Sequence, residues 1–243
     1  MEQTIPTAQP EEKPMGGASK VFNIFFEPRK VFESLRARPT WLIPFVIVAL
    51  LVIGSTYLTF PYIMKAQVER IEEMENIPEA RKSAIIEQME QIDQPPVWQV
   101  AIIPVFSLFL LVLFSAVLFF VFNVLMGGDS SYRSVLSVYS YSGLVAIPAL
   151  IVKLPLITMK ETLNVQTSLA LLPFANPDSR FLYSVLSGFD IFSLWQVILI
   201  SMGLGVMYKY TTAKAFTAVV ILWVLLIVVK SGLSSGLGMS FGF

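Results

Sequence analysis

The sequence predicts an all-α, polytopic membrane protein: a bundle of about five transmembrane helices with an N-terminal interfacial amphipathic helix. Two observations carry the prediction. Hydrophobic residues make up 55% of the 243 residues and charged residues 14%, whereas soluble domains carry about 25% charge. The apolar residues also gather in long runs, each near the ~20 residues that a helix needs to cross ~30 Å of hydrocarbon.

The N-terminal 18 residues are predicted to form a disordered cytoplasmic tail. They include Pro6, Pro10 and Pro14 and no aromatic residue, so they lack the apolar surface that would offset the entropy of ordering. No apolar stretch precedes a small-residue cleavage site, and we therefore expect no cleavable signal peptide. The first span is expected to direct membrane insertion.

Residues 19–40 are predicted to form an amphipathic segment, broken at Pro28, that lies among the lipid headgroups. Aromatic side chains recur there at helical spacing and basic residues stand between them, the composition of an interfacial helix. The side chains expected at the lipid interface are Phe22, Phe25, Phe26, Arg29, Lys30 and Phe32.

Residues 41–243 are predicted to form the transmembrane domain. Its five apolar runs are 41–62, 99–126, 135–158, 191–208 and 215–237. The alternative is four spans and one re-entrant helix, because prolines and Lys153 interrupt the third run and the fourth is short. The polar loop 65–96 carries eight acidic residues and is expected to be helical on both sides of Pro78.

The basic residues predict the orientation. The N-terminal side carries nine Lys and Arg residues and the opposite side seven, a weak bias by itself. Four of the nine lie between Arg29 and Arg38, directly before the first span, which usually dominates topology. We therefore expect a cytoplasmic N-terminus and an external C-terminus, in what we interpret as a prokaryotic cytoplasmic membrane.

Composition excludes several classes of function. The 17 basic and 17 acidic residues balance, which argues against nucleic-acid binding. The chain has no cysteine and no histidine, so thiol chemistry and the usual zinc sites are excluded, and we expect no metal and no cofactor. An enzyme is not expected, since a histidine base and a pair of intramembrane carboxylates are both missing. A Ser-Lys dyad that includes Lys153 stays formally open.

The third and fourth runs hold the polar residues of the membrane domain. Small and hydroxyl side chains there suit close helix packing, although a polar path for a substrate is an alternative. Asp190 is expected to cap the fourth helix, and Lys153 to snorkel outwards or else pair with Asp190 or Glu161. The residues expected to pack helices or bind a partner are Ser134, Ser137, Tyr141, Pro148, Lys153, Asp190, Gln196 and Gly203.

Several short segments, in order, resemble the Yip domain family, the Ypt/Rab-interacting membrane proteins, in its prokaryotic form. They are the lead Val21–Leu35, the span that opens with Trp41 and Pro44, the Ser- and Tyr-rich stretch Gly127–Pro148, and Phe189–Trp195. The resemblance implies five spans, a cytoplasmic N-terminus and no known catalytic residues. In eukaryotes it implies Rab GTPases, vesicle formation and membrane curvature, and in some prokaryotes an association with ABC-type exporters.

The sequence therefore favours a non-enzymatic membrane scaffold or adaptor that binds the lipid bilayer and a partner membrane protein, or associates with itself. The alternative is a transporter or an accessory subunit of an ABC-type export system.

Overall fold

The computed structural model describes residues 15–163, 165–173 and 179–237, and within them the chain is helical almost throughout. Five helices are long and apolar enough to cross a membrane, which confirms the predicted all-α polytopic fold. They are α3 (Leu42–Glu72), α5 with its terminal π-turn (Val97–Leu125), α6 to α7 (Tyr132–Lys160), α9 (Ile191–Tyr208) and α10 (Thr212–Leu237).

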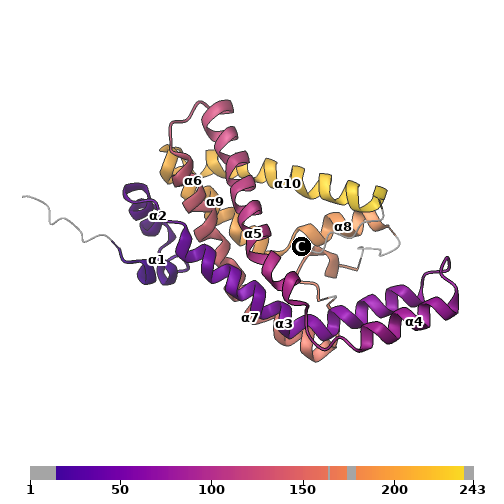
Figure 1. The fold of residues 1–243 in the computed structure, drawn as a ribbon. Coiled ribbons are helices and arrows are strands. Elements are labelled where there is room, and N and C mark those ends of the chain that lie inside the picture. Colours follow the sequence, from indigo (N-terminus) through magenta and orange to yellow (C-terminus); the bar gives the residue numbers. More distant parts are fainter. Residues whose placement is uncertain (1–14, 164, 174–178, 238–243) are drawn as a thin grey trace, which may run out of the picture.

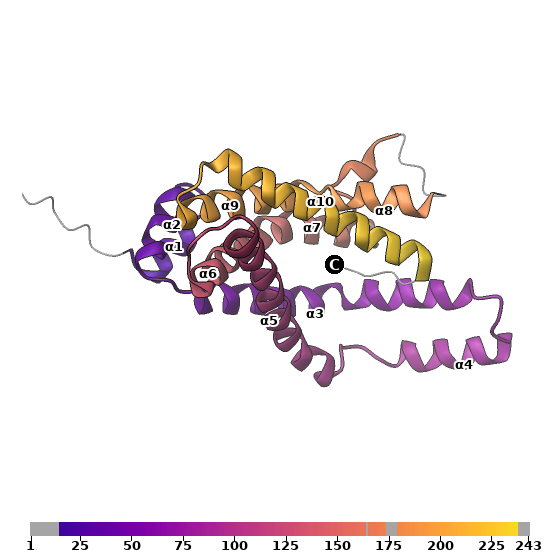
Figure 2. The same ribbon diagram turned by 90° about the horizontal axis from the view of Figure 1, so that it is seen from above.

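Helix α9 lies at the centre of the bundle and contacts α6, α10 and α2 (Pro28–Ala37). Figures 1 and 2 show α1 (Gly17–Asn23) and α2 gathered at one end of the molecule, and the hairpin of α3 and α4 (Glu79–Glu90) extending from the other end. The short helix α8 (Arg180–Gly188) packs against α10.

The N-terminal segment folds as two short helices. The expected break lies at Pro28, which occupies the first turn of α2, where its missing N–H costs nothing. Helix α1 begins at Gly17, slightly before the predicted boundary. The rest of the predicted disordered tail, residues 1–14, lies outside the described residues.

Helix α3 continues well beyond the predicted end of the first span at residue 62. Its 31 residues give a length of about 46 Å at 1.5 Å per residue. The polar segment after the span is helical on both sides of Pro78, as predicted. The Lys82 ammonium of α4 ties the two helices together by donating to the Glu72 carbonyl of α3 (2.9 Å), and it also pairs with the Glu79 carboxylate of its own helix (2.8 Å).

The third span is one helical column with a local change of winding. Helix α6 (Tyr132–Ser142) passes through a 3₁₀ turn, Gly143–Val145, into α7 (Ala146–Lys160). Pro148 stands in the first turn of α7, where a helix tolerates proline. The column of 29 residues is long and apolar enough to cross a membrane.

The turn between α5 and α6 is fixed by contacts with the end of α9. Helix α5 ends in a π-helical turn, Phe120–Leu125, and Gly127 follows with a positive φ of 67°. The Tyr208 hydroxyl donates to the Asn123 side-chain carbonyl, and the Asn123 amide donates to the Ser130 carbonyl at 3.1 Å. Two spans that are distant in sequence are thereby joined at the end of the molecule that holds α2.

Candidate functional site

The apolar face of α2 docks on α6 and α9 inside the protein. Gly203 makes the approach possible: a Cβ atom there would lie 2.5 Å from Val138 Cγ1 and 2.9 Å from Phe32 Cε1. Phe32 is fully buried, so the expectation that this ring faces lipid is wrong. Interior side chains and lipid tails are equally apolar, and an amphipathic pattern does not distinguish between them.

The other expected interfacial side chains have separate environments. Phe25 packs edge-to-face against Trp195, with 6.0 Å between ring centroids. Phe22 and Phe26 lie against each other with 5.0 Å between centroids, and they are 66% and 68% exposed. Arg29 and Lys30 begin α2 and pair with Glu33 and Glu27 respectively. The large apolar side chains that the segment exposes are thus the Phe22 and Phe26 rings, which precede two basic residues that each pair with an acidic one.

The hydroxyl groups of the third span form local hydrogen bonds and contacts with the start of α3. Ser137 donates to the Arg133 carbonyl at 2.7 Å, and the Ser134 and Ser131 hydroxyls lie 2.8 Å apart. Tyr141 is fully buried, with its hydroxyl 3.4 Å from that of Thr40. Pro148 is half-buried on the same column. Tyr141 thus reaches the start of the first span, whereas the Ser134 and Ser137 hydroxyls bond within their own helix and its N-terminal cap.

Lys153 forms an ion pair with Asp190, its ammonium lying 3.1 Å from Asp190 Oδ2. Of the expectations for Lys153, the pair with Asp190 is therefore correct and outward snorkelling is wrong. The predicted cap is confirmed, because Asp190 Oδ1 accepts from the backbone N–H of Phe192 (2.9 Å) and Ser193 (3.4 Å). Sequence spacing alone did not show which of two acidic residues the lysine would meet.

Thr167 completes this polar centre, and no pattern in the sequence predicted its part in it. Its hydroxyl donates to Asp190 Oδ2, while Thr167 itself precedes the isolated β-bridge between Ser168 and Asp190. Burial opposes the charged form of Asp190, but the bonds from Thr167 and Lys153 outweigh it and hold the pKa of the carboxyl below its ordinary value. The centre fastens α7 to the start of α9 with a carboxylate.

A groove of about 210 Å³ opens between α5 and α10, with α9 as its floor. We call it the lateral groove. Gln196 of α9, another of the expected packing or partner-binding residues, lines this groove together with Ser193. The remaining lining is mainly apolar and includes Phe114, Leu118, Tyr139, Ile200, Leu222, Trp223 and Leu226. In the part of the chain that the structure describes, the Gln196 amide makes no side-chain hydrogen bond.

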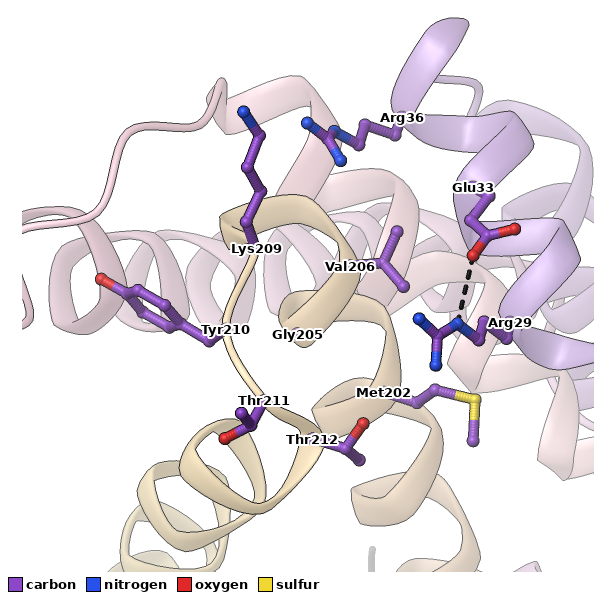
Figure 3. Close-up of a pocket in the computed structure, with 10 residues that line it drawn as sticks. All are labelled: Arg29, Glu33, Arg36, Met202, Gly205, Val206, Lys209, Tyr210, Thr211 and Thr212. Atoms are coloured by element: carbon purple, nitrogen blue, oxygen red, sulfur yellow. Dashed lines mark hydrogen bonds and ion pairs between the residues drawn. The ribbon is translucent and has the colours of Figure 1, made fainter.

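A second cavity, of about 300 Å³, lies where α2 meets the turn between α9 and α10 (Figure 3). We call it the basic pocket, because Arg29, Arg36 and Lys209 line it. The sequence showed these residues only as charges that set the orientation, since nothing in their spacing places α2 beside the end of α9. No group of three or more potential metal-ligating residues lies together within the described ranges.

Comparison with known families shows to which family these features belong. The Yip1 domain matches residues 22–232, which include α3, α5, α6 to α7 and α9 and most of α10, the helices of the described residues that could span a membrane. No curated protein and no solved structure matches the chain. The match covers the amphipathic segment and the first, third and fourth spans on which the resemblance was based, and it confirms the resemblance to the Yip domain family. The chain belongs to the Yip1 domain family.

Proposed function

We propose that this chain is a non-enzymatic membrane scaffold or adaptor that receives a transmembrane helix of a partner membrane protein in the lateral groove. The observation that carries the proposal is the Gln196 amide on the floor of that groove. By the rise per residue, Gln196 lies about 18 Å along α9 from its end at Tyr208. It lies about 8 Å from the other end of α9, at Ile191, and we therefore infer that the amide lies in the hydrocarbon region.

A lipid tail can pack against the apolar walls of the groove, but it offers no hydrogen bond to the Gln196 amide on the floor. An amide without a hydrogen-bond partner in hydrocarbon is costly, and interhelical hydrogen bonds from Gln side chains are a recurrent means of helix association. A partner helix with a polar side chain facing Gln196 meets both requirements. The hydroxyl of Ser193, one turn away in the same groove, adds a second polar contact.

The exposed phenylalanine pair supports the lipid-binding part of the proposal. Phe22 and Phe26 stand next to Arg29 and Lys30 at the start of α2. Apolar rings beside basic side chains suit the boundary between acyl chains and anionic headgroups. We infer that α1 rests on the membrane surface through these rings while α2 is held by the protein.

Photo-crosslinking tests the groove directly. A photoreactive phenylalanine analogue at Leu226, 43% exposed and in the groove, should capture the partner in membranes. The same analogue at Ile221, 63% exposed on the same helix but outside the groove, is the matched control. Gln196→Leu should reduce capture at Leu226 several-fold, because the interhelical hydrogen bond is lost, whereas Gln99→Leu on the exposed end of α5 should not.

The outcomes separate the proposal from its competitors. Equal crosslinking at Leu226 and Ile221, or capture indifferent to Gln196→Leu, would contradict a helix seated in the groove. Capture of a second copy alone would assign the groove to self-association. If the chain is instead a transporter or exporter subunit that works through the third span, Lys153→Leu should abolish flux while insertion and groove crosslinking persist.

A further inference from the structure

The basic pocket contains positive charges that are not paired with acidic side chains within the described residues. Its three basic side chains come from two elements: Arg29 and Arg36 from α2, and Lys209 from the end of α9. Arg29 Nε donates to Glu33 at 3.1 Å. Among the described residues, Arg36 and Lys209 have no such acidic partner, and Figure 3 shows the Arg36 guanidinium extending toward the Lys209 side chain.

The turn that carries Lys209 is held firmly. Lys209 ends α9 in the left-handed conformation, with φ of 57°. The Tyr210 hydroxyl donates to the Met126 carbonyl at 3.0 Å, and the Lys214 ammonium lies 3.8 Å from the centre of the Tyr210 ring. A residue other than glycine in this backbone region persists only where its surroundings hold it there. The backbone of Lys209 is therefore fixed at the edge of the basic pocket.

We propose that the basic pocket binds a phosphate group. A phosphate presents several oxygen atoms and at least one negative charge, so it satisfies a guanidinium and an ammonium together, in charge-assisted hydrogen bonds. The Thr211 hydroxyl accepts from the Lys214 N–H at 3.3 Å, which leaves its own proton available for a phosphate oxygen. Glu33 is neutralised by Arg29 and does not cancel this attraction.

The phosphate has two possible sources, a phospholipid headgroup and a soluble phosphate compound. The pocket lies at the end of α9 and the beginning of α10, which is the level of a membrane surface. The inference goes beyond the proposed function because the pocket and the lateral groove share no lining residue. Loss of phosphate binding is expected to leave crosslinking at Leu226 unchanged, so the two proposals fail separately.

Calorimetric titration of the purified full chain in detergent micelles tests the proposal. The probes are dioctanoyl phosphatidic acid, dioctanoylglycerol, which has the same tails without phosphate, and inorganic phosphate. We expect saturable binding of dioctanoyl phosphatidic acid and none of dioctanoylglycerol. Binding of inorganic phosphate with equal affinity assigns the site to a soluble phosphate, whereas affinity for the lipid at least tenfold higher assigns it to a headgroup.

Substitutions in the basic pocket test whether phosphate binds there. The double variant Arg36→Gln/Lys209→Gln should weaken phosphate binding by about tenfold or more, since each charge-assisted bond contributes at least that factor. Both side chains are exposed, and the unfolding temperature should stay unchanged. Arg133→Gln removes an exposed charge at the same end of the bundle, outside the pocket, and is the control. No saturable binding, binding of dioctanoylglycerol, or equal weakening by Arg133→Gln would overturn the proposal.

Discussion

Asp190 shows how much one side chain contributes to this bundle. It caps α9, pairs with Lys153 and accepts from Thr167, so a single carboxylate joins two transmembrane columns and an intervening loop. Only 12% of its side chain is exposed, and 33% of that of Lys153. Removing the carboxylate leaves the lysine without a counter-charge in a mostly apolar setting.

The lowered pKa of Asp190 makes a prediction about acid stability. Its ordinary value is near 3.8, so the stability that it contributes is fully present above about pH 4 and is lost as pH falls through the lower folded value. We expect thermal unfolding in micelles to show this loss in the wild type and a flatter acid profile in Asp190→Asn. At pH 7, Asp190→Asn should be less stable by about 1–3 kcal/mol. Superimposable acid profiles would contradict this role.

At the scale of elements, α1 and α2 divide the amphipathic segment between lipid and protein. Phe32 on α2 is enclosed by α6 and α9, whereas Phe26, in the turn before α2, is exposed. The sequence predicted one interfacial surface because both rings lie on the apolar side of the same pattern. Only the close approach that Gly203 permits shows which ring enters the protein.

Two alanine variants should separate these roles. Phe32→Ala is expected to lower the free energy of unfolding by about 3–5 kcal/mol, because a fully buried ring leaves a cavity. Phe26→Ala should leave stability nearly unchanged and instead raise hydrogen exchange of α1 in membrane-bound protein, since a lipid contact is lost. Equal destabilisation by both variants, or unchanged exchange in Phe26→Ala, would argue against the division.

At the scale of the whole molecule, run length and hydropathy were sufficient to predict the spans. The fourth run and α9 share their bounds, and the fifth differs by a few residues at its start. The candidate functional sites were harder to predict from the sequence. The Lys153–Asp190 pair and the basic pocket each join residues that are distant in sequence and follow no common periodicity, so only the packing of the helices brings them together.

The predicted orientation is testable because the chain has no cysteine. With a cytoplasmic N-terminus, an impermeant maleimide should label Glu90→Cys on α4 in intact cells, and it should label Ser19→Cys and Lys214→Cys only after the cells are opened. All three positions are exposed. Labelling of Ser19→Cys together with protection of Glu90→Cys in intact cells would reverse the topology and place the basic pocket outside.

The length of α3 has a further consequence for the molecule in its membrane. At about 46 Å the helix exceeds the hydrocarbon thickness, and Lys82 fastens α4 to its far end. A helix whose apolar stretch is longer than the bilayer is thick tilts or bends. Helix α3 can bend at Pro61, which follows Ser55, Thr56 and Thr59, whose hydroxyls bond back to helix carbonyls. In thinner or thicker bilayers the α3–α4 hairpin would therefore stand at a different height and angle, so that lipid composition sets how far it reaches from the membrane.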